Sequence, residues 1–346
     1  MVGQPGFFDL DKRLEALSDK GDPLEVIEAA VPWESFRPAI EAAVCTNPVE
    51  RKSNAGRKAY DAILKFKMLT LASLYNLSDE QLEYQVRDRL SFMRFLGLGI
   101  ETPVPDATTI WLFREELAKA GVVKDLFDKF NQHLDAKGFI ARGGQMIDAS
   151  IIAVPKQRND RDENDVIKAG KTPEGWEKKP AKNQQKDKDA RWTKKHGKSY
   201  FGYKNHVNAD ARHKIIRRYC VTTASVHDSR EFEGLLDRTN TSRDVFADSA
   251  YRSAETEAKL KEQGYRSCIH RRGARGAPLT ERQQKTNRNK SKTRARVEHV
   301  FAAQEMAPGG RQVRTIGIER AATKIGLQNL VYNIRRLVSL QRMAPA

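Results

Sequence analysis

The spacing of apolar residues changes at Gly143 and Gly144, and this change most constrains how the chain can fold. Before it, apolar residues recur at helical spacing. The stretch 59–77 is apolar on nearly every side and predicts a central buried helix. Directly after it, GQMIDASIIAV is rich in β-branched residues and predicts a strand. We therefore expect a helical domain over 1–140 and a sheet-containing domain over 141–346.

Capping signals divide the first domain. Ser78 is placed to cap a helix over 80–98, and Asp106 precedes a helix over 108–121 that Gly121 can end. Two such helices fit a helix-turn-helix or the ordinary packing of a helical bundle, and the sequence does not decide between them.

The element order of the second domain predicts a sheet with helices on its faces. After the first strand comes 156–198, a polar, basic stretch that we interpret as a surface excursion, and then two strands that form a hairpin turning at 211–213. The remaining elements alternate: helix 228–238, strand 243–248, helix 253–263, strand 265–270, a basic loop, helix 292–305 and helix 321–341. This order, βββαβαβα, predicts an α/β fold with a ribonuclease H-like mixed sheet.

The charge is divided as unevenly as the pattern. Residues 1–140 contain 18 Lys and Arg against 22 Asp and Glu, whereas 141–346 contain 44 against 23, a net charge of +21. A basic half of this strength is typical of a protein that binds nucleic acid, because binding releases condensed counterions. With no signal peptide, no apolar stretch long enough to span a membrane and three distant cysteines, we expect a cytoplasmic, nucleoid-associated protein without disulfides.

Three acids stand out against this basic background. Asp148 lies inside the first strand, Asp248 ends a later strand, and Glu298 lies on a helix with an apolar stripe. Each alone has a simpler explanation: a buried hydrogen bond, a helix cap and an ion pair with Arg294. In the predicted strand order they can converge, and clustered carboxylates need a hard cation such as Mg²⁺ or Mn²⁺. Two ions about 4 Å apart would serve phosphoryl transfer.

A basic wall is expected around these acids. The stretch 270–296 has ten Lys and Arg against one Glu, which indicates a surface that follows phosphates, and Arg294 is the best candidate to grip one near the reaction. We interpret Asp228, by contrast, as a helix cap. The residues predicted to contact double-stranded DNA are Lys204, Tyr251, Arg252, Arg271, Arg272, Arg294 and Arg296.

The chain resembles bacterial DDE transposases of the insertion-sequence-5 type along nearly its whole length. The resemblance lies in MIDASIIAVPKQRND, DARWTKKHGKSYFGYKNHVNAD, ADSAYRS, RARVEHVF and VRTIGIERAATKIGLQNLVYNIRRL. It implies that Asp148, Asp248 and Glu298 are the catalytic, metal-binding triad. It also implies a homodimer whose helical domain recognises transposon ends, and a catalytic domain that cuts those ends and joins them to target DNA.

The sequence departs from the family around the glutamate. The family's Tyr–Arg–Glu–Lys pattern is met by Arg294 and Glu298, but Ser291 stands at the tyrosine position and Glu305 at the lysine position. Either Arg311 or Arg314 substitutes for the lysine, or end binding is weakened. We therefore expect an active transposase that binds terminal inverted repeats. The alternative is a catalytically inactive, transposase-derived DNA-binding protein.

Overall fold

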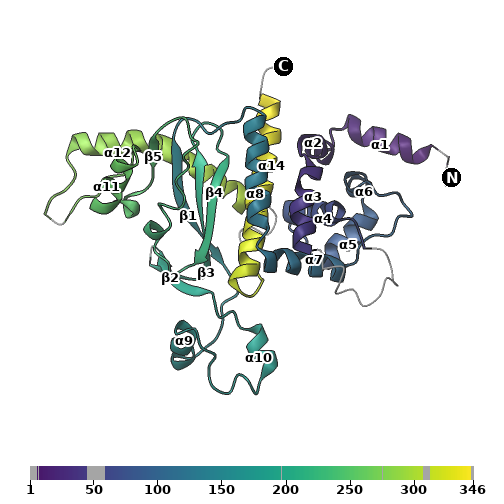
Figure 1. The fold of residues 1–346 in the computed structure, drawn as a ribbon, viewed down its shortest axis with the longest axis horizontal. Helices are drawn as coiled ribbons and strands as arrows, with labels where there is room; N and C mark the ends of the chain where they lie inside the picture. The colour runs from purple at the N-terminus through teal and green to yellow at the C-terminus, as the bar shows by residue number, and fades with distance from the viewer. Residues whose placement is uncertain are drawn as a thin grey trace. The chain divides into compact units, whose positions relative to one another are not determined.

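The computed structural model describes residues 6, 8–44, 59–195, 197–274, 276–306 and 312–343 (Figure 1). Two compact units emerge: residues 1–133 together with 330–346, and residues 134–329. The predicted domain boundary at 140/141 lies near the first of these divisions. The grouping differs from the prediction in that the last residues of the chain belong with the first unit.

The first unit is helical, as predicted. Its elements are α1 (Asp9–Asp19), α2 (Pro23–Ala30), the 3₁₀ turn η1 (Trp33–Phe36), α3 (Arg37–Val44), α4 (Ala62–Tyr75), α5 (Asp79–Asp88), α6 (Leu90–Leu96), α7 (Ala107–Ala120) and most of α8 (Val123–Ala136). Helix α4 buries consecutive residues from Met68 to Ala72, which confirms it as the central helix. Edge-to-face rings surround it, with Trp33 and Phe36 lying 6.1 and 5.2 Å from the Phe66 ring.

The predicted caps of this unit are correct, but one helix is not continuous. Ser78 forms a capping box with Gln81, and Asp106 accepts a hydrogen bond from the Thr109 amide. The helix expected over 80–98 breaks at Arg89, whose backbone is extended, and so becomes α5 and α6. Residues 97–106 then separate α6 from α7, too long a connection for the short turn of a helix-turn-helix. The structure thus favours the ordinary helical bundle.

The second unit is built on a mixed six-stranded sheet (Figure 1). Strand β3 pairs antiparallel with β1 on one side and with β4 and β2 on the other, while β5 and β6 continue the sheet beyond β1 in parallel. The strands are β1 (Gln145–Ala153), β2 (Arg191–Lys195), β3 (Lys198–Asp210), β4 (Ile216–Thr223), β5 (Asp244–Phe246) and β6 (Arg266–Ser267). The hairpin predicted around 211–213 is the turn between β3 and β4.

The helix predicted over 228–238 is wrong. Only the 3₁₀ turn η3 (Asp228–Arg230) forms there, and residues 231–235 continue as a bend and turns. Phe232, Leu235 and Leu236 are still buried in a core cluster with Ile147 of β1. The spacing of these three residues suits a helix, but the segment buries the same side chains without forming one.

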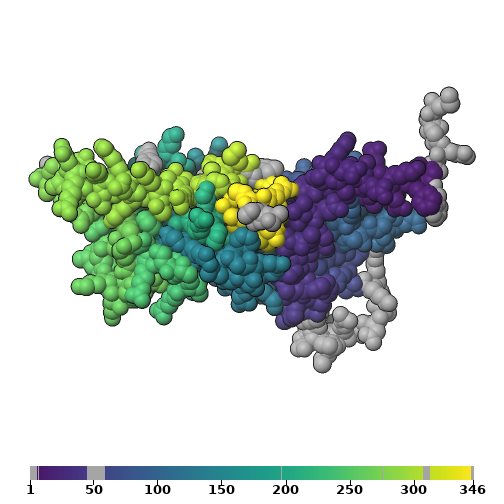
Figure 2. Space-filling view, turned by 90° about the horizontal axis from the view of Figure 1, so that it is seen from above, coloured from purple at the N-terminus to yellow at the C-terminus, as the bar shows by residue number. Residues whose placement is uncertain are grey.

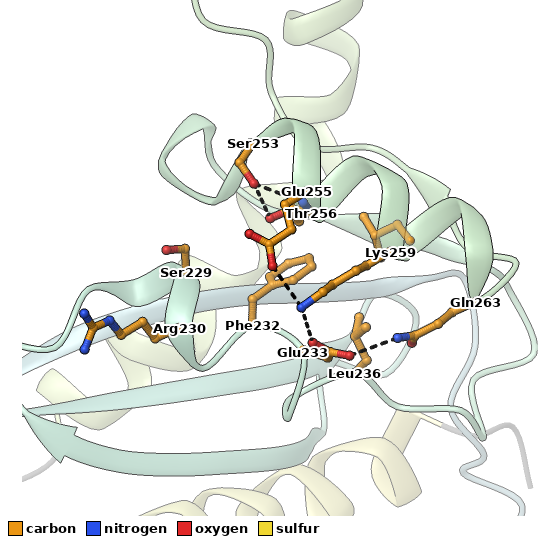
Figure 3. A pocket seen from close by; sticks show the side chains of 11 residues that line it. Ser229, Arg230, Phe232, Glu233, Leu236, Ser253, Glu255, Thr256, Lys259 and Gln263 are labelled. Carbon is orange, nitrogen blue, oxygen red and sulfur yellow. Dashed lines mark hydrogen bonds and ion pairs between the residues drawn. The ribbon is translucent and has the colours of Figure 1, made fainter.

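Helix α11 (Ala254–Glu262), predicted within one residue at each end, holds the turn segment in place. Ser253 caps α11, and Lys259 pairs with Glu233 of the turn segment at 3.0 Å. Figure 3 shows Gln263 reaching the same carboxylate, at 3.2 Å. The cavity of about 270 Å³ drawn there is therefore lined by side chains that already satisfy one another.

The stretch expected to be a basic loop contains a helix. Thr280 forms a capping box with Gln283 and starts α12 (Glu281–Arg294), which has no buried residue. The next helix, α13 (Arg296–Glu305), begins after Ala295, so the helix predicted over 292–305 is two helices. Figure 2 shows this yellow-green part of the chain exposed at the surface. Because α12 buries no apolar face, its tertiary ties are polar: Asn287 exchanges hydrogen bonds with the Arg271 backbone, and Lys290 donates to the Ile269 carbonyl.

The excursion at 156–198 is also more structured than predicted. It contains α9 (Arg161–Lys168), α10 (Pro180–Gln185) and β2, and its Trp176 is only 2% exposed. Polar composition was misleading here because one tryptophan, covered by lysine stems, is enough to form a small local core.

The closing helix, predicted over 321–341, is α14 (Ile318–Met343), whose first half packs through Ala321 and Ile325 against Phe201 and Tyr203 of the sheet. Within the described ranges, no helix is both long enough and apolar enough to cross a bilayer.

Candidate active site

A cleft of about 800 Å³ opens in the second unit where β1, β5 and α13 come together. Four carboxylates and two cations are among the described side chains that line it. They are Asp148, Asp248, Glu298, Glu305, Arg294 and Lys195. All three acids singled out in the sequence thus lie on one cleft, although Asp248 and Glu298 follow Asp148 by 100 and 150 residues in the chain.

Strand register brings the two aspartates together. In the parallel pair of β1 and β5, Met146 lies opposite Phe246. Asp148 and Asp248 each follow these partners by two residues, and both line the cleft. The Asp248 carboxylate also caps the 3₁₀ turn η4 (Ser249–Tyr251) by accepting from the Ala250 amide at 2.8 Å. The cap expected as the simpler explanation is therefore real, and it fixes the carboxylate at the rim.

Asp148 is the most enclosed of the three acids. The pKa of its carboxyl is raised from 3.8 to about 6, chiefly by burial and in smaller part by the Asp248 charge. A hydrogen bond from the Ala149 amide at 2.8 Å and the Arg294 charge act in the opposite direction. A carboxyl that is difficult to ionise beside a second carboxylate is a group that gains from a bound cation.

Arg294 supplies such a cation in this structure. Its guanidinium lies between Asp148 at 3.3 Å and Glu298 at 3.4 Å, one turn later on the chain. The helix-face ion pair considered for Glu298 is therefore present. Although Glu298 lies on a helix with an apolar stripe, its side chain is 64% exposed, because its side of α13 faces the open cleft.

The donor set has the chemistry of a site for a hard divalent ion, since it offers carboxylate oxygens and a buried acid beside a second one. Its present arrangement is not a closed metal site. Over the described ranges, no group of three or more His, Cys, Asp or Glu side chains is gathered closely enough to hold one ion. Arg294 lies between two of the acids, so a metal ion would have to replace its guanidinium there.

Two of the predicted DNA contacts are buried. Tyr251 is 1% exposed and packs against Phe232 with ring centroids 5.5 Å apart. Lys204 is 11% exposed and forms an ion pair of 2.8 Å with Asp228. In this structure both side chains are engaged by neighbouring residues of the same unit, and their contact with DNA stays a prediction.

The prediction that Asp228 is a helix cap is corrected. The cap of η3 is His227, whose ring nitrogen accepts a hydrogen bond from the Ser229 amide. Asp228 instead forms an ion pair with Lys204.

The predicted arginines divide into engaged and exposed groups. Arg252 donates to the Ile269 carbonyl and pairs with Glu257 at 3.2 Å. Arg271 and Arg272 are exposed just before α12, and the Arg271 backbone exchanges hydrogen bonds with the Asn287 side chain. Arg296 is exposed and donates to the Ala211 carbonyl. Of the substitutes considered for Glu305, Arg314 is exposed but does not line the cleft, and Arg311 lies outside the described residues.

Lys195 and Tyr200 line the cleft from the β2–β3 hairpin, and the sequence reasoning missed both. The signal was present in RWTKKHGKSYF, where Gly197, with φ +77°, turns between two alternating segments. Treating 156–198 as a single polar excursion hid this hairpin.

Comparison with known proteins decides the family. The model of the transposase DDE domain matches residues 141–334, and that of a second transposase domain (DUF772) matches 12–116. The chain belongs to the DDE transposases. It is accordingly a DNA transposase of the insertion-sequence kind, and the family depends on a divalent metal ion. A cryo-EM structure of the piggyBac transposase synaptic complex with hairpin DNA aligns over 91% of this chain and 72% of that one, at TM-score 0.44 and 11% identity. This similarity is too low to carry an argument.

Proposed function

We propose that Asp148, Asp248 and Glu298 are the catalytic triad of this transposase, on a ribonuclease H-like sheet. Asp148 and Asp248 each lie two residues after a pair of opposite residues in β1 and β5, and Glu298 lines the same cleft. This arrangement is the observation that carries the proposal. The strand order β4–β3–β1–β5–β6, in which β3 runs antiparallel to the other described strands of the sheet, supports the ribonuclease H-like assignment.

The three carboxylates would hold Mg²⁺ or Mn²⁺, and two ions fit the proposed chemistry. When bound, such ions stabilise the attacking and leaving oxygens of an in-line phosphoryl displacement. Asp148 and Asp248 would supply ligand oxygens from the rigid sheet, and Glu298 would supply one from α13. Arg294, released from Asp148 and Glu298, would be free to hold a phosphate next to the scissile bond.

The substrate we propose is double-stranded DNA carrying the terminal inverted repeats of the element, which is cut at its ends and joined to target DNA. The exposed arginines at 271, 272 and 296 and the basic α12, which has no buried residue, would follow the DNA backbone beside the cleft. Two ends processed together call for a homodimer, with the helical unit in end recognition. The place of action we propose is the bacterial nucleoid.

The test is cleavage of a duplex that carries the element's terminal repeat, in the presence of Mg²⁺. We expect nicking by the wild-type chain and a loss of at least a hundredfold in Asp148→Asn, since one ligand oxygen loses its charge. The matched control is Asp165→Asn, which removes a carboxylate of the excursion, outside the cleft.

Unchanged nicking by Asp148→Asn would refute the triad. A wild-type chain that binds the repeat but neither nicks it nor joins a pre-cut end to target DNA would favour an inactive, DNA-binding descendant. Glu305 on the cleft wall is the feature that would then explain the loss.

A further inference from the structure

The β2–β3 hairpin presents one polar face to the cleft. Lys195 and Tyr200 line the cleft, and strand pairing sets Lys195 opposite Lys198 and Tyr200 opposite Thr193. Because side chains alternate along a strand, these four residues share one face. Lys194 lies on the opposite face, as do Trp192 and Phe201, whose rings are 5.2 Å apart.

The base of this hairpin is fixed to the sheet. Phe201 is buried in the cluster that includes Ile152 and Val154 of β1. At Gly202, with φ +152°, the backbone passes so close to β1 that a Cβ would lie 2.1 Å from the Ile152 carbonyl oxygen. Only glycine allows this approach, and it ties the hairpin to the strand that bears Asp148. The cleft-facing residues are thus held at a defined place relative to that acid.

Lys195 is the less committed of the two cations lining the cleft. Arg294 is already shared between Asp148 and Glu298. The Lys195 side chain is exposed, and no hydrogen bond or ion pair joins it to another described residue. It is nevertheless close enough for its charge to lower the pKa of the Asp148 carboxyl. An exposed ammonium group therefore lines the same cleft as the three acids.

A DNA strand that approaches these acids meets electrostatic repulsion. Four carboxylates line the cleft, and Glu305 adds its charge on the same helix as Glu298. A lysine ammonium is a compact cation with three donors that suits a phosphate oxygen, and a tyrosine hydroxyl can donate to the same group. Lys195 and Tyr200 bring both groups to the lining of the cleft.

We propose that Lys195, together with the Tyr200 hydroxyl, binds a backbone phosphate of the DNA strand in the cleft and positions that strand against the three acids. The inference rests on the proposed function of the cleft. It assigns to the hairpin a cationic contact that α13, with Glu305, does not supply. Lys195 is on this view a positioning residue, because it touches a phosphate and takes no part in bond breaking.

The test measures binding of the full chain to a fluorescently labelled duplex carrying a pre-cut terminal repeat, in Ca²⁺, by anisotropy over a series of salt concentrations. We expect Lys195→Ala to raise Kd about tenfold, as for loss of one charged hydrogen bond. The slope of log K against log salt should fall by about one, as for one lost phosphate contact. Lys195→Arg should retain affinity and slope, and Tyr200→Phe should raise Kd about fivefold with the slope unchanged.

Lys194→Ala is the matched control, because it removes an equal charge from the other face of the same strand. A Lys195→Ala chain with the affinity and slope of wild type would overturn the inference, as would equal effects of Lys194→Ala and Lys195→Ala. Neither outcome touches the triad, which is judged separately by Mg²⁺-dependent nicking in Asp148→Asn. Active Asp148→Asn protein would end the proposed function instead.

Discussion

At the scale of single residues, the Asp148 carboxyl is costly to ionise. Its carboxyl is enclosed beside Asp248, and its pKa rises from 3.8 to about 6. The cost of ionising it is offset in part by Arg294 at 3.3 Å. Because burial makes this carboxyl difficult to ionise, its charged form destabilises the fold.

The pH dependence of stability follows from this raised pKa. Between about pH 4 and pH 6 the folded chain holds a proton that the unfolded chain has released, so the contribution of Asp148 to stability falls as pH rises through this window. In EDTA at pH 8 we expect Asp148→Asn to be more stable than wild type, with a free energy of unfolding about 2 kcal/mol higher. The difference should vanish below about pH 4.

Chemical denaturation at several pH values measures this effect, and the exposed Asp165→Asn should show no such gain at pH 8. A lower stability of Asp148→Asn at pH 8 would mean that the ion pair with Arg294 outweighs the cost of burial.

At the scale of elements, the excursion between β1 and β2 is a small folded module. The Trp176 indole donates to a Glu163 carboxylate oxygen at 2.8 Å, and Lys182 donates to that oxygen at 2.6 Å while its ammonium lies 4.7 Å from the ring centroid. Glu163 also completes a capping box with Asp160 at the start of α9. One aromatic and one acid thus hold α9 and α10 together.

Replacing Trp176 should open this module without unfolding the sheet. Replacing a buried tryptophan by alanine lowers the free energy of unfolding by about 3–5 kcal/mol. We expect this loss to exceed the free energy that keeps so small a module folded. We expect Trp176→Ala to lose amide-exchange protection in α9 and α10 and to be cleaved faster by protease within 156–190. Trp192→Ala, at a tryptophan 44% exposed, is the control and should leave both helices protected. Simultaneous loss of protection in β1 and β3 would contradict a separate module.

At the scale of the whole molecule, charge dominates. The chain carries a formal net charge of +17, and its excess of Lys and Arg falls in residues 141–346. Because each neutralised phosphate releases counterions, we expect affinity for duplex DNA to fall on the order of a thousandfold between about 50 and 200 mM salt. Titration of a labelled duplex at several salt concentrations measures this. A change below about tenfold would show that few of these cations touch phosphate.

The sequence by itself determined the helical first half, its caps at Ser78 and Asp106, most of the strand order and the three acids that now lie on one cleft. The helices, caps and strands follow from local periodicity and capping residues. The three acids stood out because a carboxylate among apolar residues is costly to bury unless it is paired. The burial of Tyr251 and Lys204 and the turns at 231–235 were decided only by tertiary structure. So was the arrival of Lys195 at the cleft. Each depends on which partner lies across the sheet, and no local pattern encodes a neighbour that is distant in the chain.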